Sequence, residues 1–110
     1  MHKVIYLYIL KCHDNSFYIG VTNDLEVRLN QHQEGINPDS YTFSRRPVEL
    51  VFYEIFTDFN LAFEWETKLK KWSRAKKQAL INGEYDSLKQ LSKKKFKEKR
   101  NANSDTAPEE

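Results

Sequence analysis

Five side chains that could act on a phosphodiester are spread along the first two thirds of the chain. They are Tyr8, Tyr18, Arg28, His32 and Glu66. Phosphodiester hydrolysis needs a group that takes a proton from water, a cation that neutralises the phosphorane and an acidic ligand that holds Mg²⁺. The set contains one candidate for each task, so the question is whether the fold gathers them.

The N-terminal pattern predicts a β-hairpin. Residues 4–10 are apolar at every position, which is typical of a central strand covered on both faces, and residues 17–21 follow after a polar turn at 13–16. Because side chains alternate between faces, a three-residue loop puts Tyr8 and Tyr18 on one face and a two-residue loop puts them on opposite faces. A nuclease site requires the former.

A helix is expected to follow the hairpin. Asn23, with Glu26 three residues later, resembles a capping box, and Gly35 is a typical stop after residue 34. Arg28 and His32 share the i, i+3, i+4, i+7 face with the leucines at 25 and 29, which should dock on the sheet. Two interpretations follow. Arg28 and His32 are either site residues, or Arg28 packs its aliphatic stem and extends its guanidinium into water while His32 is a hydrogen-bonded structural residue.

A polar loop at 35–47 and a third strand at 48–56 should come next. The loop carries Arg45 and Arg46, which either contact phosphate or form a surface pair that protects the following strand. A second helix is expected from about residue 58 to 71 or 72, with an apolar stripe of Leu61, Trp65, Leu69 and Trp72.

Glu66 lies beside that stripe, where a carboxylate needs a partner. A metal ion or Arg28 would provide one. The alternative is an i, i+4 salt bridge to Lys70, which contributes only tenths of a kcal/mol.

A third short helix should be capped by Ser73 and end at Asn82-Gly83, with a last helical turn or two over 84–91. Residues 92–110 are basic and then acidic, and we expect a mobile tail. The organisation predicted is one nuclease-like domain over 1–91 followed by this tail.

Charge is distributed unevenly along the 110 residues. The net charge is −5 over residues 1–67, +10 over 68–100 and −3 over 101–110, within a total of +2. A basic block attracts polyanions, although it is also compatible with a solvated helix face and a lysine-rich tail. We therefore consider seven basic residues as nucleic-acid contacts: Arg45, Arg46, Lys70, Lys71, Arg74, Lys76 and Lys77.

Several other classes of protein are disfavoured. The lone Cys12 excludes an internal disulfide, suits a reducing cytoplasm and is expected to be a small buried hydrophobe. The three histidines have spacings unsuited to structural zinc, and no apolar run is long enough to span a membrane. None of the three glycines lies in a phosphate-cradling loop, so no small-molecule cofactor is expected.

At this point the sequence resembles the GIY-YIG nucleases, especially their small stand-alone bacterial members. The resemblance covers roughly residues 3 to 82. The second half of the family motif is intact as Tyr18-Ile19-Gly20. In the first half only Tyr8 matches, because Tyr6 and Leu7 stand where the family has Gly and Ile. The segments 18–32, 45–50 and 70–74 also agree with the family in order and spacing.

The resemblance implies a role for each residue. Tyr8 would be the general base, assisted by a nearby cation, by the metal ion, or by hydrogen bonds from Tyr18 and His32. Arg28 would stabilise the phosphorane, and Glu66 would hold one Mg²⁺ or Mn²⁺ ion. Gly20 would keep the strand backbone clear for close approach.

The fold predicted is α/β (α+β), a small three-stranded antiparallel sheet flanked by helices, like a GIY-YIG endonuclease. The function predicted is metal-dependent hydrolysis of nucleic acid, DNA before RNA, in the cytoplasm. Two alternatives remain: a nucleic-acid-binding module with weak or lost activity, and a protein-interaction domain that uses exposed aromatic residues such as Phe52, Tyr53, Phe56 and Phe59.

Overall fold

The computed structural model describes residues 3–84. The chain divides into two compact units, Met1–Lys71 and Trp72–Glu110, which we describe separately. The last helical turns expected over 85–91 and the tail expected over 92–110 lie outside the described residues. The single domain over 1–91 therefore stays a prediction.

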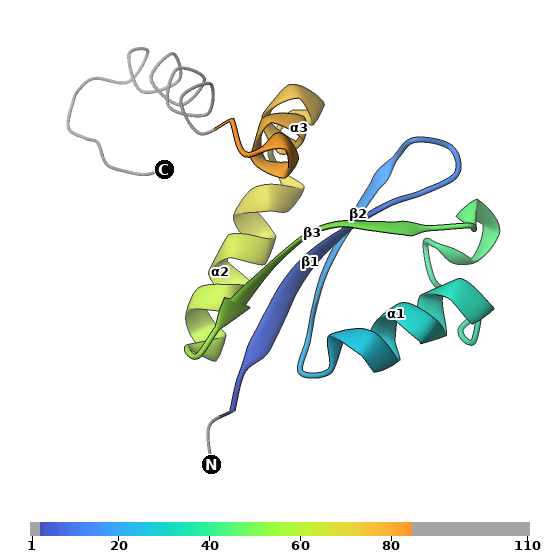
Figure 1. Ribbon diagram of the computed structural model, residues 1–110, viewed down its shortest axis with the longest axis horizontal. Helices are drawn as coiled ribbons and strands as arrows, with labels where there is room; N and C mark the ends of the chain where they lie inside the picture. Colours follow the sequence, from blue (N-terminus) through green and yellow to red (C-terminus); the bar gives the residue numbers. More distant parts are fainter. Residues whose placement is uncertain (1–2, 85–110) are drawn as a thin grey trace. The chain divides into compact units, whose positions relative to one another are not determined.

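The first unit holds most of the regular structure (Figure 1). In chain order its elements are β1 (Ile5–Lys11), β2 (Phe17–Thr22), α1 (Leu25–Glu34), the 3₁₀ turn η1 (Phe43–Arg45), β3 (Glu49–Phe56) and α2 (Phe59–Lys70). The second unit contributes α3 (Arg74–Asn82). None of the helices within residues 3–84 is long and apolar enough to cross a membrane.

The three strands form one antiparallel sheet in the order β2-β1-β3. The central place of β1 explains its apolar sequence, because both of its faces are covered, and Ile9 and Leu10 are 0% exposed. A register shift between these two residues interrupts the pairing of β1 with β3. The predicted fold class is confirmed.

The β1–β2 turn closes over a local hydrogen-bond network. Cys12 donates its backbone N–H to Ser16 O (2.9 Å), and Asn15 donates to Cys12 O (2.9 Å). Asn15 has φ of 70°, a left-handed conformation that asparagine tolerates better than most residues. Cys12 is 3% exposed and belongs to the core, as expected.

The two faces of the sheet are covered by different helices, with α1 on one side and α2 on the other (Figure 1). The α1 side has a core of Tyr8, Leu10, Cys12 and Val48, against which Leu25 and Leu29 of α1 pack. Alternation along β1 sends Ile5, Leu7 and Ile9 to the opposite face. α2 packs against all three strands.

The start of α1 differs from the sequence prediction. Asp24, not Asn23, is the N-cap: its backbone is extended and its Oδ1 accepts the N–H of Val27 at 3.1 Å. Glu26 therefore stands one position too early to close a capping box, but its charge still favours the first turn. The end is as predicted, with Gly35 at φ of 66°.

The inner face of α2 is also turned relative to the prediction. Leu61 is 41% exposed, whereas Ala62 and Leu69 are buried and Trp65 and Glu66 are half-buried. Positions 62, 65, 66 and 69 form an i, i+3, i+4, i+7 set, so the buried stripe is displaced by about a quarter turn from Leu61. Glu66 thus belongs to the buried face.

The second unit agrees with the sequence over its described part. Ser73 caps α3 by accepting the N–H of Lys76 at 3.2 Å, and Gly83 ends the helix at φ of 74°. Both signals were readable because each is a local interaction of neighbouring residues.

The corrected cap gives a direct test. Asp24→Ala removes the acceptor for the α1 N-terminus and should lower the free energy of unfolding by about 1 kcal/mol. Asn23→Ala, one residue earlier and equally exposed, should change it by less than about 0.5 kcal/mol. Urea titrations of both variants measure the difference, and a larger loss for Asn23→Ala would reassign the cap.

Candidate active site

The hairpin register brings Tyr8 and Tyr18 to the same face of the sheet. Tyr8 pairs with Gly20 and Leu10 pairs with Tyr18, so the intervening loop is odd in length. The two rings lie 6.3 Å apart between centroids. The geometric requirement of the nuclease interpretation is therefore met.

Gly20 determines where the Tyr8 hydroxyl lies. A Cβ built at position 20 would fall 2.6 Å from Tyr8 Oη and 2.8 Å from Cζ, closer than real atoms approach. The Tyr8 ring thus crosses β2 directly over Gly20, towards the edge that β2 forms in the sheet. The close approach expected at Gly20 is made by the protein's own tyrosine.

His32 reaches the same hydroxyl from α1. Its Nε2 lies 3.0 Å from Tyr8 Oη in a buried hydrogen bond, and its ring centroid lies 5.1 Å from that of Tyr18. The side chain is 8% exposed. An imidazole in this place must be hydrogen-bonded at both nitrogens, because burial leaves it no water.

Arg28 and Glu66 act on Tyr8 from opposite layers of the fold. Arg28, on α1, lowers the pKa of the Tyr8 phenol, whereas the negative charge of Glu66, on α2, is the smallest of the influences that raise it. Arg28 donates from Nε to Gln31 Oε1 at 3.1 Å. The hydroxyl itself lies over Gly20 of β2 and is hydrogen-bonded to His32 of α1.

Comparison with known proteins decides the family. The profile of the GIY-YIG catalytic domain matches residues 4–79. The chain belongs to the GIY-YIG family. Membership places it in a nuclease superfamily whose substrates are nucleic acids and whose members generally use divalent metal ions.

Its relatives are small proteins of the same kind. The UPF0213 protein of Bacillus pumilus is 46% identical over 76 residues, which cover 69% of this chain and 76% of that protein. UPF0213 protein YazA of Bacillus subtilis is 43% identical over 82 residues, covering 74% and 82%. The solution structure of EF2693 from E. faecalis is 33% identical, with a TM-score of 0.55 over 76% of this chain and 88% of that one.

Within this GIY-YIG site, the protonation of Tyr8 is governed by burial. Desolvation, together with the neighbouring Tyr18, raises the pKa of Tyr8 to about 12, and Arg28 only partly offsets this. The assistance to ionisation expected from a hydrogen bond of Tyr18 stays a prediction. Burial and the charge of Arg28 lower the pKa of His32, so its ring is neutral at pH 7.

Glu66 is the carboxylate of this site that suits a metal ion. Its side chain is 19% exposed, and Lys70 Nζ lies 3.1 Å from its Oε2. The i, i+4 salt bridge considered from the sequence is therefore present. It occupies one oxygen, and Mg²⁺ needs only one or two protein carboxylates because it keeps several waters, so the residue fits a hydrated ion if Lys70 turns away.

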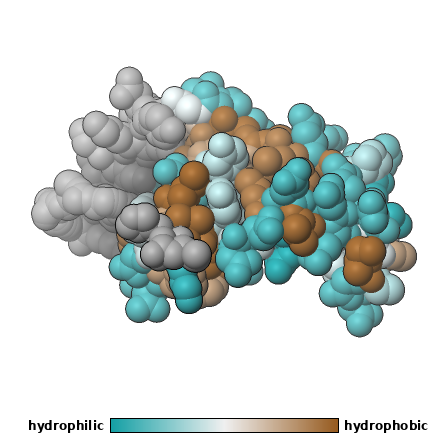
Figure 2. Space-filling model, turned by 60° about the horizontal axis from the view of Figure 1, so that its bottom comes forward, coloured by the Kyte–Doolittle hydropathy of each residue, from teal (hydrophilic) through white to brown (hydrophobic). Residues whose placement is uncertain are grey.

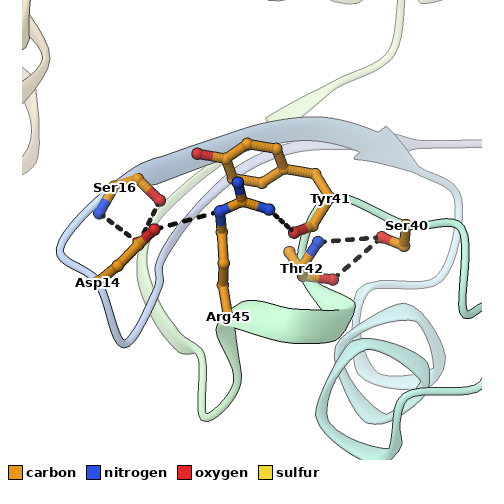
Figure 3. A network of polar contacts seen from close by, with 6 residues as sticks. All are labelled: Asp14, Ser16, Ser40, Tyr41, Thr42 and Arg45. Carbon is orange, nitrogen blue, oxygen red and sulfur yellow. Dashed lines mark hydrogen bonds and ion pairs between the residues drawn. The ribbon is translucent and has the colours of Figure 1, made fainter.

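Arg45 and Arg46, considered as phosphate contacts, both have partners within the protein. Arg45 bridges the hairpin turn and the loop before β3 (Figure 3): Nε donates to Asp14 Oδ2 at 3.1 Å and Nη1 donates to Tyr41 O at 2.7 Å. Its guanidinium carbon lies 3.8 Å from the centre of the Tyr41 ring. Arg46 donates to Phe43 O at 2.9 Å. Both arginines fix the loop, and phosphate contact by them stays a prediction.

The basic residues of the C-terminal half are presented differently from one another. Lys70 and Lys71 on the first unit are exposed, as is Arg74 on the second. Lys77 is half-buried, whereas Lys76 is 7% exposed with Nζ 4.4 Å from the centre of the Trp72 ring. Contact of these five residues with nucleic acid stays a prediction.

Sequence reasoning missed the contribution of the loop at 40–45. Thr42 is 1% exposed, and its Oγ1 lies 2.7 Å from His32 Nδ1. Tyr41 stacks on Tyr18, with centroids 6.1 Å apart. No periodic signal could identify these residues, because they lie in irregular structure where burial is set by long-range packing.

An open cleft of about 620 Å³ lies apart from this site. Its lining includes Tyr6, Tyr53 and Ile55 together with residues of α1, and none of the predicted catalytic residues. Tyr53 and Ile55 are each 50% exposed. Figure 2 shows apolar surface between hydrophilic stretches on one face of the molecule. Such surface is common in proteins of this size and does not by itself identify a partner.

The pKa of Tyr8 predicts how stability depends on pH. Because folding raises this pKa from 10.0 to about 12, the stabilisation is present below pH 10 and is lost as pH rises through about 12. We expect the free energy of unfolding of the wild type to fall more steeply above pH 10 than that of Tyr8→Phe. Urea titrations at several pH values measure the slopes.

Tyr53→Phe, which removes an exposed hydroxyl, is the matched control and should keep the wild-type slope. Equal slopes for Tyr8→Phe and the wild type would mean that Tyr8 ionises as it does in the unfolded chain.

Proposed function

We propose that this protein is an endonuclease that hydrolyses phosphodiester bonds in DNA with one Mg²⁺ or Mn²⁺ ion. Membership of a nuclease superfamily supports the reaction class. The single observation that carries the proposal is the buried hydrogen bond of 3.0 Å between Tyr8 Oη and His32 Nε2. A core that needed only packing would not place a neutral imidazole against a buried phenol whose pKa also responds to the charges of Arg28 and Glu66.

Tyr8 and His32 together accept the proton of the attacking water. A phenol with a pKa of about 12 keeps its proton at pH 7, so Tyr8 cannot act alone. In our proposal Tyr8 Oη accepts a proton from water while its own proton moves to neutral His32, 3.0 Å away. The water oxygen bonds to phosphorus, the bond to the leaving oxygen breaks, and that oxygen takes a proton from solvent.

Arg28 stabilises the charge that develops on the phosphorane. Its guanidinium stays protonated at any relevant pH, and its planar donors match two phosphate oxygens. The same group lowers the pKa of Tyr8, which favours the form of the phenol that accepts the proton of the nucleophile. Replacement by lysine would keep the charge and lose the paired geometry.

Glu66 is proposed to hold the divalent ion. The ion would supply charge neutralisation during hydrolysis. Lys70, which now pairs with Glu66 Oε2, would have to turn away and would then be available to phosphate.

Phosphate backbone contact is proposed for the basic segment that begins near Lys68. Lys71 and Arg74 are exposed and suited to this, and Lys77 is half-buried. Lys76 would need to leave Trp72 to take part. The excess of positive charge over 68–100 supports this assignment.

Glu66→Gln tests the enzyme directly. The change keeps the shape of the side chain and removes the charge that holds metal, so Mg²⁺-dependent cleavage of plasmid and branched DNA should fall by roughly 100-fold or more. DNA binding measured in EDTA should be equal or tighter. Glu64→Gln, an exposed glutamate on the same helix, is the control and should cleave like the wild type.

The other outcomes are equally informative. Cleavage that survives in Glu66→Gln would place the metal elsewhere. A wild type that binds DNA and cuts none of the substrates would favour the binding module. Loss of folding in Glu66→Gln, but not in Glu64→Gln, would make Glu66 structural through Lys70.

The salt dependence of DNA binding tests the basic segment. If Lys71 and Lys77 contact phosphates, Lys71→Gln with Lys77→Gln should weaken binding and lower the slope of log K against log salt by about 2. Lys3→Gln, which removes an exposed lysine outside this segment, is the control and should leave the slope unchanged. Fluorescence anisotropy at several salt concentrations gives the slopes. An unchanged slope in the double variant would show that Lys71 and Lys77 are solvated surface residues that do not contact phosphate.

A further inference from the structure

Thr42 makes the second hydrogen bond of His32. Its Oγ1 lies 2.7 Å from His32 Nδ1, while Nε2 lies 3.0 Å from Tyr8 Oη. Both the threonine and the histidine are buried, at 1% and 8% exposed. The imidazole is therefore held at both nitrogens by groups that exclude water.

The direction of these bonds follows from what each group can donate. The Tyr8 side chain is 1% exposed, so its phenolic proton has no bulk water to donate to and needs an acceptor within the protein. Within residues 3–84, the acceptor in hydrogen-bond reach of Oη is His32 Nε2. A neutral imidazole that accepts at Nε2 carries its proton on Nδ1.

The remaining bonds complete one chain with a single direction. His32 Nδ1–H donates to Thr42 Oγ1, which leaves the Thr42 hydroxyl proton to donate elsewhere. Ser40 Oγ lies 3.1 Å from Thr42 Oγ1 and can accept it (Figure 3). The side-chain donors of Tyr8, His32 and Thr42 thus each have an acceptor, and Ser40 accepts at the end of the chain.

We infer that Thr42 is a positioning residue that holds His32 in its Nδ1–H tautomer, so that Nε2 faces Tyr8 as a proton acceptor. The inference rests on the proposed function for its catalytic meaning. When the phenolic proton moves to Nε2, His32 becomes an imidazolium, and Thr42 Oγ1 still accepts from Nδ1–H. Without this acceptor the ring is free to adopt the Nε2–H form, which donates to Tyr8 and cannot take its proton.

The loop that carries Thr42 is built to hold it in place. Phe43 N–H donates to Ser40 O and Arg45 N–H donates to Thr42 O, each at 3.0 Å. The ion pair of Arg45 with Asp14 at 3.1 Å then ties this turn to the β1–β2 hairpin. These contacts fix the threonine hydroxyl from both sides along the chain.

Two substitutions separate the hydroxyl from the packing. Thr42→Val keeps the shape and removes the acceptor, whereas Thr42→Ser keeps the acceptor. In the wild type, ¹⁵N NMR of the imidazole in the metal-free, DNA-free protein should show a protonated Nδ1 and an unprotonated Nε2. Thr42→Ser should keep this signature, and Thr42→Val should shift it towards Nε2–H.

Cleavage should follow the same order. For Thr42→Val we expect the turnover rate with saturating DNA to fall about 10- to 100-fold, the usual effect of losing a residue that orients a histidine, with restoration to near the wild-type rate in Thr42→Ser. Thr22→Val makes the same change at another buried threonine, 5% exposed, and should not alter either readout.

The outcomes distinguish this inference from the proposed function. A protonated Nε2 in the wild type would overturn the inference, and so would an unchanged tautomer together with full cleavage in Thr42→Val. A wild type that shows the expected tautomer but cuts no DNA would overturn the proposed function and leave the role of Thr42 in orienting the ring standing. Since the wild-type spectrum is itself decisive, an unfolded Thr42→Val leaves the test intact.

Discussion

The missing side chain at position 20 is the constraint on which the site depends. Only because Gly20 has no Cβ does the Tyr8 ring cross β2 and bring its hydroxyl to the sheet edge, where a Cβ would lie 2.6 Å from Oη. At that edge His32 of α1 contacts the hydroxyl, and the charge of Glu66 acts on it from α2, which covers the opposite face. A sheet of only three strands has few such places, since its central strand is covered on both sides.

The same placement creates the chemical difficulty that the neighbours must solve. Burial raises the pKa of Tyr8 to about 12, the wrong direction for a general base, and the cation of Arg28 offsets only part of this. A neutral imidazole in direct contact offers a route for the proton that does not require a free phenolate at pH 7. The electrostatics therefore favour a tyrosine–histidine pair over a tyrosine acting alone.

How far the sequence predicted the structure depended on whether each signal was local. The three strands, the end of α1 at Gly35 and the cap of α3 were predicted, because alternation, left-handed glycine and a serine cap are properties of neighbouring residues. The sequence prediction placed the N-cap of α1 one residue too early. Asparagine and aspartate are equally good capping acceptors, and the sequence does not show which of the two has the extended backbone of an N-cap. The burial of Thr42 and the exposure of Leu61 on α2 escaped prediction because tertiary packing, not periodicity, sets them.

Some residues of the site are buried and others are not, so finding the same residue in a relative means different things at different positions. Tyr8, His32 and Thr42 are each less than 9% exposed, so packing would preserve them even in a chain that had lost its activity. Arg28 and Glu66 are only half-buried, and replacing them would cost the core far less. Across such proteins, the pair of opposite charges is therefore the better marker of surviving catalysis, while the tyrosine that names the motif is the better marker of the fold.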